Sequence, residues 1–216
     1  MREKPPITFV EYERIFRVLY TVLDDRAVTH RACIFFAVAG ANLLREHHRM
    51  KADPVSGAAA ILVDDAAGNV ATFAAIDQGF FLASEDRFHC WVQCDGWIVD
   101  FMMPLLKENM RATGAEWAIP RRMFQRPIAE GGSCPEDFNR RSANFVFLPS
   151  AERTIAMHAN FHARPASEDL SQVCNAWYRR PPRKMPATLD MGDNTGGVTR
   201  LKLHGPSIEG AWFAQA

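Results

Sequence analysis

A cysteine, a histidine and an aspartate in the first half of the chain are of the types that form a nucleophilic catalytic site. His89 and Asp100 belong to residues 87–101, whose alternating aromatic and β-branched residues predict a β-hairpin around an Asp95-Gly96 turn. A two-residue turn fixes the strand register, which makes Asp100 a diagonal neighbour of His89. The carboxylate can then orient the imidazole, and such a pair activates a Ser, Cys or Thr supplied by another element.

Cys33 is the best candidate for that nucleophile. It lies in residues 29–44, which are predicted to form a helix capped by Thr29, with Cys33 and Gly40 in its buried stripe. The thiol is then close to the positive end of the helix dipole, which lowers the pKa of a cysteine and favours the thiolate. Alone, Cys33 would be a small core residue, and it is the combination with His89 and Asp100 that indicates catalysis.

The alternation along the hairpin also assigns residues to the face that carries His89. We expect that face to hold Trp91, Gln93, Ile98, Asp100 and Met102. Trp91 and Gln93 are therefore expected to line the active cleft, where Trp91 would shield the Asp–His hydrogen bond from water, although core packing explains a Trp there almost as well. His30 is either a group beside Cys33 or a surface residue.

The order of these residues resembles that of a known superfamily. The chain is similar to the transglutaminase-like branch of papain-like proteins, in which a Cys at the start of a helix is followed by a His-x-Trp-Val strand, a short turn and an Asp shortly before a Pro. The matching residues here are Cys33, His89-Cys90-Trp91-Val92, Asp100 and Pro104. The resemblance covers about a third of the chain. It implies a papain-like core with Cys33 as nucleophile, His89 as base and Asp100 as orienting group. It further implies acyl transfer or amide hydrolysis through a thioester, but it does not imply a substrate. We expect a small-molecule or peptide amide or acyl substrate and no cofactor.

Two departures from the family pattern define an alternative. Ala32 stands where many such families have Gly, and no upstream Gln or Trp can be assigned to an oxyanion hole, which leaves the backbone N–H of Cys33 as a donor. Members with an incomplete site can be inactive, so the alternative is a non-catalytic binding or interaction domain that keeps the scaffold. Several bacterial families of this type are domains of unknown function, and the chain fits such a family.

The composition excludes several other functions. The chain has 216 residues, 48% of them hydrophobic, and its 25 Lys and Arg balance 25 Asp and Glu, so binding to nucleic acid or to an anionic membrane is not expected. It has no apolar run of membrane-spanning length and no apolar secretory signal at the N-terminus, so a cytoplasmic protein is expected. Its five cysteines have no regular spacing, which favours reduced thiols. The oligomeric state is not indicated.

A zinc site is the competing use for these cysteines and histidines. On one strand, Cys90 and Cys94 would lie roughly 13 Å apart at about 3.3 Å per residue, which is too far to share a zinc ion or to form a disulfide. Both are therefore expected in the core, and no metal is expected.

The predicted fold class is α+β, with N-terminal helices packed on an antiparallel β-sheet. The first helix is expected over residues 9–23, and the second, which carries Cys33, is expected to pack on the strand of His89. Strands over residues 58–63, 70–76 and 80–82 are expected to form an antiparallel meander that leads into the hairpin.

The chain is expected to form one main domain with a C-terminal addition. Residues 1–165 are predicted to be the papain-like or transglutaminase-like core domain. Residues 166–216 are predicted to add a helix capped by Ser167, an exposed Pro-rich linker over residues 179–197 and a tail over the sheet, all packed on the same domain.

Overall fold

The computed structural model describes residues 4–213, which form six α-helices and ten β-strands. The helices are α1 (Phe9–Leu23), α2 (Cys33–His48), α3 (Leu106–Ala112), α4 (Glu136–Asn139), α5 (Ala151–His162) and α6 (Pro165–Trp177). The strands are β1 (Ala52–Asp64), β2 (Asn69–Phe73), β3 (Ala75–Asp77), β4 (Phe80–Leu82), β5 (His89–Cys94), β6 (Trp97–Asp100), β7 (Phe124–Pro127), β8 (Phe145–Pro149), β9 (Thr188–Gly192) and β10 (Val198–Lys202). The expected mixture of helices with an antiparallel sheet is confirmed.

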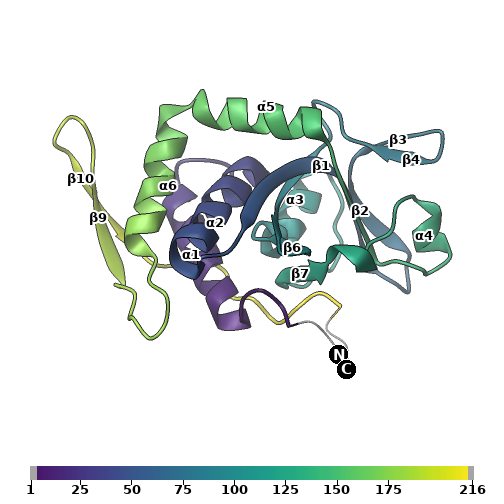
Figure 1. Ribbon diagram of the computed structural model, residues 1–216, viewed down its shortest axis with the longest axis horizontal. Helices are drawn as coiled ribbons and strands as arrows, with labels where there is room; N and C mark the ends of the chain where they lie inside the picture. Colours follow the sequence, from purple (N-terminus) through teal and green to yellow (C-terminus); the bar gives the residue numbers. More distant parts are fainter. Residues whose placement is uncertain (1–3, 214–216) are drawn as a thin grey trace.

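The centre of the fold is an antiparallel sheet in the order β2-β1-β5-β6-β7, with β8 also paired to β1. The long strand β1 holds this sheet together, because its first half pairs with β5 and its second half pairs with β2 and β8. The expected meander is therefore wrong in its order: β1 rather than β4 is the neighbour of β5, while β3 and β4 form a hairpin of their own (Figure 1).

Gly57 lies in β1 where three strands meet. It pairs both with His89 of β5 and with Pro149 of β8. A Cβ atom at Gly57 would lie 2.0 Å from the carbonyl oxygen of Leu148, so a larger residue would push β8 away. Gly57 thus lets β8 lie close to β1 at the residue that pairs with His89, the candidate base.

The β5–β6 hairpin has the predicted register. Gln93 pairs with Ile98, and the turn residues Asp95 and Gly96 have φ angles of 47° and 82°, as a type I′ turn requires. Strand β6 ends at Asp100, where the chain bends into a short 3₁₀ segment. The register therefore places the carboxylate of Asp100 at the end of the hairpin, level with the start of β5.

Helices α1 and α2 pack together, and α2 lies against β5 and β1 (Figure 1). The predicted capping box at the start of α1 is present, with Thr8 and Glu11 bonded to each other's backbone N–H. Gly40 allows α2 to approach the end of β6, because a Cβ atom there would lie 2.5 Å from the ring of Phe101. The expected packing of the Cys33 helix on the His89 strand is confirmed.

Helix α2 begins at Cys33 rather than at Thr29. Residues Thr29–Arg31 form a separate 3₁₀ turn, and Ala32 is the N-cap with no side-chain hydrogen bond, so the expected Thr29 cap is wrong. A hydrogen bond of 2.6 Å from Asn109 Nδ2 of α3 to the carbonyl oxygen of His30 holds this turn. Cys33 is consequently the first residue of the helix, where the positive end of its dipole lies.

The last fifty residues depart from the expectation at two points. Helix α6 begins at Pro165 with Arg164 at the N-cap, so Ser167 lies inside the helix instead of capping it. Part of the expected linker forms β9, which pairs with β10 in a hairpin that projects at the opposite end of the molecule from β3 and β4 (Figure 1). The tail does return to the sheet, because Ala211 pairs with Met123 and Trp212 is buried.

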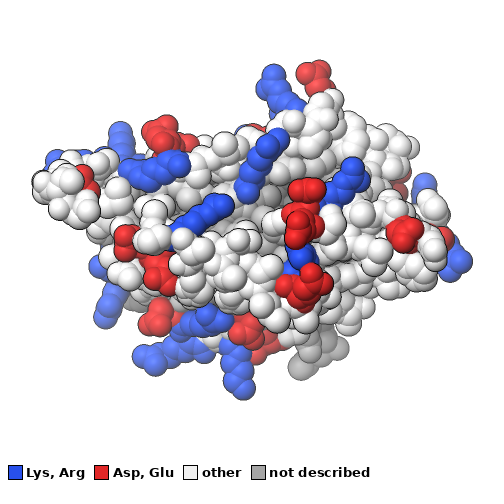
Figure 2. All heavy atoms as spheres, turned by 90° about the horizontal axis from the view of Figure 1, so that it is seen from above, with Lys and Arg blue, Asp and Glu red and all other residues white. Residues whose placement is uncertain are grey.

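The surface carries both signs of charge. Figure 2 shows Lys and Arg side chains interspersed with Asp and Glu on one face of the molecule. No helix within residues 4–213 is both long enough and apolar enough to cross a membrane. Because the two signs of charge are mixed on the surface, any preference for a charged ligand must come from a local group of residues.

Candidate active site

His89 and Asp100 form a buried pair. The His89 Nε2 atom lies 2.5 Å from Asp100 Oδ2, and both side chains are 1% exposed. The second carboxylate oxygen, Oδ1, accepts a hydrogen bond of 2.9 Å from the backbone N–H of Met102. The hydroxyl of Tyr12 in α1 donates to the backbone carbonyl of Asp100. Asp100 is thus held from two directions, and it in turn fixes the orientation of the imidazole.

Aromatic rings enclose the imidazole of His89. The ring of Phe73 in β2 stacks on it at 4.7 Å between centroids, and the ring of Phe147 in β8 meets it edge-on at 6.1 Å. Trp91 packs on the far side of Phe147, at 5.0 Å. Phe73 and Phe147 therefore shield the Asp–His hydrogen bond, a role that the sequence had suggested for Trp91.

Strand β5 serves the site with both of its faces. Cys90, Val92 and Cys94 belong to the core shared with α2, whereas Trp91 belongs to the core on the opposite side of the sheet. Because α2 begins beside the start of β5, the thiol of Cys33 interacts with the side chains of both Cys90 and His89. Cys90 is thus a member of the site that sequence reasoning missed, having assigned it to the core alone.

The surroundings of Cys33 favour its thiolate. A hydrogen bond from the Cys90 thiol contributes most and lowers the pKa of Cys33; burial opposes this effect, and the charged imidazole of His89 adds to it. The result is a pKa lowered to about 5. Burial, followed by the same hydrogen bond, raises the pKa of Cys90, so Cys90 remains a protonated donor.

The proton that Cys33 loses resides on His89. Burial lowers the pKa of His89, but the Asp100 carboxylate and its hydrogen bond, followed by the Cys33 thiolate, outweigh it and raise the pKa to about 10. Since Nε2 is bonded to Asp100, Nδ1 is the ring atom that remains for proton exchange with Cys33. A thiolate–imidazolium pair is therefore the stable form of the site near neutral pH.

A cavity of about 860 Å³ opens beside this pair, and Cys33 and His89 both line it. Trp91 and Gln93 are not among the residues of its wall, contrary to expectation: Trp91 is fully buried and Gln93 is half-buried further along β5. His30 is likewise outside the wall, although its carbonyl helps to hold the turn before α2. Cys33 itself is 8% exposed, at the floor of the cavity.

The backbone at Cys33 offers a hydrogen-bond donor for a developing oxyanion. As the first residue of α2, Cys33 has a backbone N–H without a partner inside the helix, as the first turn of any helix does. Its position beside the thiol that would attack is the geometry that an oxyanion hole needs. This agrees with the donor expected from the sequence.

Comparison with known proteins identifies the family. The family described as "Protein of unknown function (DUF2026)" matches residues 8–212. The chain belongs to the DUF2026 family. The crystal structure of genomics APC5867 is similar, with 32% sequence identity, a TM-score of 0.83, and a match that covers 98% of this chain and 99% of that chain. Among the curated proteins none matches this chain.

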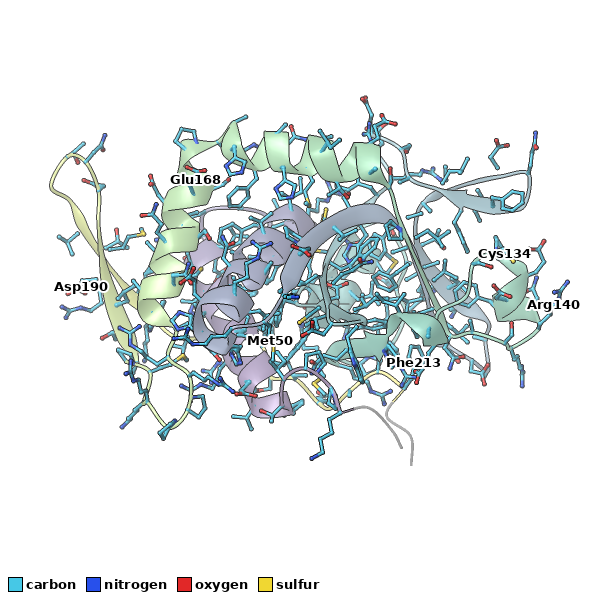
Figure 3. The ribbon with its side chains drawn as sticks, viewed as in Figure 1. Met50, Cys134, Arg140, Glu168, Asp190 and Phe213 are labelled. Atoms are coloured by element: carbon cyan, nitrogen blue, oxygen red, sulfur yellow. The ribbon has the colours of Figure 1, made fainter. Side chains whose placement is uncertain are left out.

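The other thiols of this DUF2026 chain take no part in the site. Cys94 and Cys174 are buried, and burial raises the pKa of each. Cys134 is half-buried and lies beside α4, at the opposite end of the molecule from Asp190 in β9 (Figure 3). Within residues 4–213, no three His, Cys, Asp or Glu side chains are grouped as metal ligands would be.

Proposed function

We propose that this DUF2026 protein is a cysteine-dependent hydrolase or acyltransferase of the transglutaminase-like type, built on a papain-like core. The observation that supports it most is the buried His89–Asp100 pair beside a thiol at the first residue of a helix, in the wall of a large cavity. The three groups come from α2, β5 and β6. Their arrangement, thiol beside imidazole and imidazole bonded to carboxylate, is that of a nucleophile, a base and an orienting group.

The reaction begins from the thiolate of Cys33 and the imidazolium of His89. The sulfur attacks the carbonyl carbon of an amide, which forms a C–S bond and an oxyanion beside the Cys33 N–H. When the C–N bond breaks, His89 Nδ1 gives its proton to the leaving amine, and a thioester remains on Cys33. Water, or an acceptor amine, then loses a proton to Nδ1 and attacks the thioester. The product leaves, and the thiolate and imidazolium are restored.

The pH dependence of alkylation by iodoacetamide tests the nucleophile. At about pH 6, where an ordinary thiol is protonated, we expect Cys33 to be labelled although it is nearly buried. Cys134 provides an internal control, because a hydrogen bond to Glu136 raises its pKa and it is the more exposed thiol. Peptide mass spectrometry reads both sites in the same sample.

A histidine variant tests whether the thiolate depends on His89. His89→Ala should slow the labelling of Cys33 at about pH 6 by at least about tenfold, since the imidazolium that stabilises the thiolate is lost. His162→Ala, which replaces an exposed histidine of α5, is the matched control and should change nothing. If wild-type Cys33 reacts only after unfolding, the thiol is structural and a non-catalytic binding domain is the better function.

Trapping of the acyl intermediate tests the chemistry itself. Incubation with p-nitrophenyl acetate should place an acetyl group on Cys33, detected on that peptide by mass spectrometry, and should release p-nitrophenol. Cys33→Ala should abolish both signals. An acetyl group found on Cys134 or on lysines alone would contradict the assignment of Cys33 as the nucleophile.

A further inference from the structure

We infer that the substrate is a small molecule with a negatively charged group, which Arg31 and Arg87 bind. This inference rests on the proposed function of Cys33. Both arginines line the cavity together with Cys33 and His89. Each stands two positions before a residue of the catalytic pair, Arg31 before Cys33 and Arg87 before His89. The two chain segments that supply the nucleophile and the base therefore also supply the positive charges at the cavity.

Both guanidinium groups are available to a ligand. Arg31 and Arg87 are exposed, and within residues 4–213 the guanidinium group of neither forms an ion pair or a hydrogen bond; Arg87 bonds to Ser84 only through its backbone. Other arginines of the chain are engaged: Arg121 is paired with Glu108 of α3, and Arg126 of β7 with Glu130. A free guanidinium can bind a carboxylate or a phosphate through two parallel N–H donors, which makes it specific for such groups.

The wall of the cavity carries a net positive charge. Among the described residues that line it, Asp86 is the one acidic side chain, against the two arginines. This local excess stands out because the whole chain has 25 basic and 25 acidic residues. An anionic substrate would thus be attracted to the cavity that Cys33 lines.

The remaining walls indicate the size and the body of the substrate. Phe73, Phe88 and Trp117 contribute aromatic surface to the cavity. Its volume of about 860 Å³ lies within the range of small-molecule sites, about 300–1,000 Å³. The cavity therefore fits a compact amide or thioester that combines an apolar part with a carboxylate or phosphate.

Iodoacetate and iodoacetamide provide the test, because they form the same C–S bond and release the same iodide but differ in charge. The rate of each reagent at Cys33 is measured at about pH 6.5 by peptide mass spectrometry, and the two rates are expressed as a ratio. We expect the ratio of iodoacetate to iodoacetamide at Cys33 to exceed that of the uncharged thiol N-acetylcysteinamide by about tenfold, the effect of one charge-assisted contact.

Four variants assign the effect to its source. Arg31→Gln and Arg87→Gln should each lower the ratio by about threefold to tenfold, and Asp86→Asn should raise it. Arg111→Gln is the matched control, because Arg111 is an exposed arginine of α3 that does not line the cavity. Use of the ratio removes any change in the pKa of Cys33, since such a change affects both reagents equally.

Protection experiments identify the anion. Glutarate, its neutral diamide and inorganic phosphate are each tested for their ability to slow the reaction of Cys33 with iodoacetamide. Protection by glutarate but not by the diamide assigns a carboxylate, and protection by phosphate assigns a phosphate ester. Either form of protection should be lost in the Arg31→Gln/Arg87→Gln double variant.

The outcomes separate this inference from the proposed function. A ratio equal to that of N-acetylcysteinamide, unchanged by the arginine variants, would overturn the anionic substrate while leaving Cys33 as a nucleophile. A Cys33 that fails to react even with iodoacetamide in the folded protein would overturn the proposed function, and the inference with it. A ratio that falls equally in Arg111→Gln would show a general surface effect and would also overturn the inference.

Discussion

Cys90→Ala is the sharpest test of how the site lowers the pKa of Cys33. The Cys90 thiol is the largest single influence that stabilises the Cys33 thiolate, and alanine removes this donor. A hydrogen bond to a charged group contributes about 1.5–3 kcal/mol, and one pKa unit corresponds to about 1.36 kcal/mol. The pKa of Cys33 should therefore rise by about one to two units from its wild-type value of about 5.

The assay is the rate of iodoacetamide alkylation at Cys33 as a function of pH. The midpoint of the profile should move upward in Cys90→Ala, so that the rate at about pH 5 falls by roughly fivefold or more. Cys90→Ser retains a donor of similar size and should keep the midpoint close to that of the wild type. Urea denaturation of each variant verifies that the protein is folded under the labelling conditions.

Cys94→Ala is the matched control. Cys94 lies on the same strand, on the same side of the sheet, and is 1% exposed, as Cys90 is. Its truncation leaves a similar gap in the core but removes no donor from Cys33. An equal shift in both variants would mean that packing, and not the hydrogen bond, sets the pKa. A wild-type midpoint in Cys90→Ala would refute the reasoning. His89 and the helix terminus would then be the groups that lower the pKa of Cys33.

Two further changes test the pair and its support. Asp100→Asn keeps the shape of the side chain but removes the charge that most strongly raises the pKa of His89 against the effect of burial. The pKa of His89, followed by NMR titration, should therefore fall well below its wild-type value of about 10, and labelling of Cys33 at about pH 6 should slow by at least about tenfold. An unchanged titration midpoint of His89 would contradict this. Gly57→Ala should lower the free energy of unfolding, measured in urea, by about 1–3 kcal/mol, because the new Cβ would lie 2.0 Å from the Leu148 carbonyl oxygen. Gly192 has open space around it, so Gly192→Ala should lower the free energy of unfolding by less than about 0.5 kcal/mol. Equal losses in the two variants would refute the steric argument.

The local features of this fold could be predicted because neighbouring residues determine them. The Asp95-Gly96 turn fixes the pairing of β5 and β6, and the capping box of Thr8 and Glu11 fixes the start of α1. The same reasoning brought His89 and Asp100 together, since their distance depends only on the turn between them. These are the parts of the site that lie within one hairpin.

The parts that depend on distant pairing were missed. The first half of β1 contains Pro54 and Gly57, residues with a low preference for strands, so the sequence predicted a strand only from residue 58. These residues are extended because they pair with β5 and β8, which come much later in the chain. The cap at Thr29 failed for a related reason, since Asn109 of α3 holds the preceding turn in another conformation.

The cleft residues show a different limit. Alternation correctly placed His89 and Trp91 on one face, where both pack on Phe147. However, the cavity opens only at the start of β5, so Trp91, two residues further along, is covered by the core. The alternation also put Cys90 on the opposite face, but the sequence could not show that this face meets the first residue of α2.

The position where α2 begins explains how a single thiol can interact with both faces of β5. Neighbouring side chains on a strand point to opposite sides. His89 and Cys90 can therefore both reach Cys33 only because they are the first two residues of β5 and the sulfur lies beside the beginning of that strand. This requires the first turn of α2 to lie close to the sheet. Gly40 permits that approach against Phe101, and Gly57 lets β8 lie close to β1 at the residue that pairs with His89. A side chain at Gly40 would therefore move α2, and Cys33 with it, away from the residues that lower the pKa of Cys33, whereas one at Gly57 would push β8 away from the part of β1 that pairs with His89.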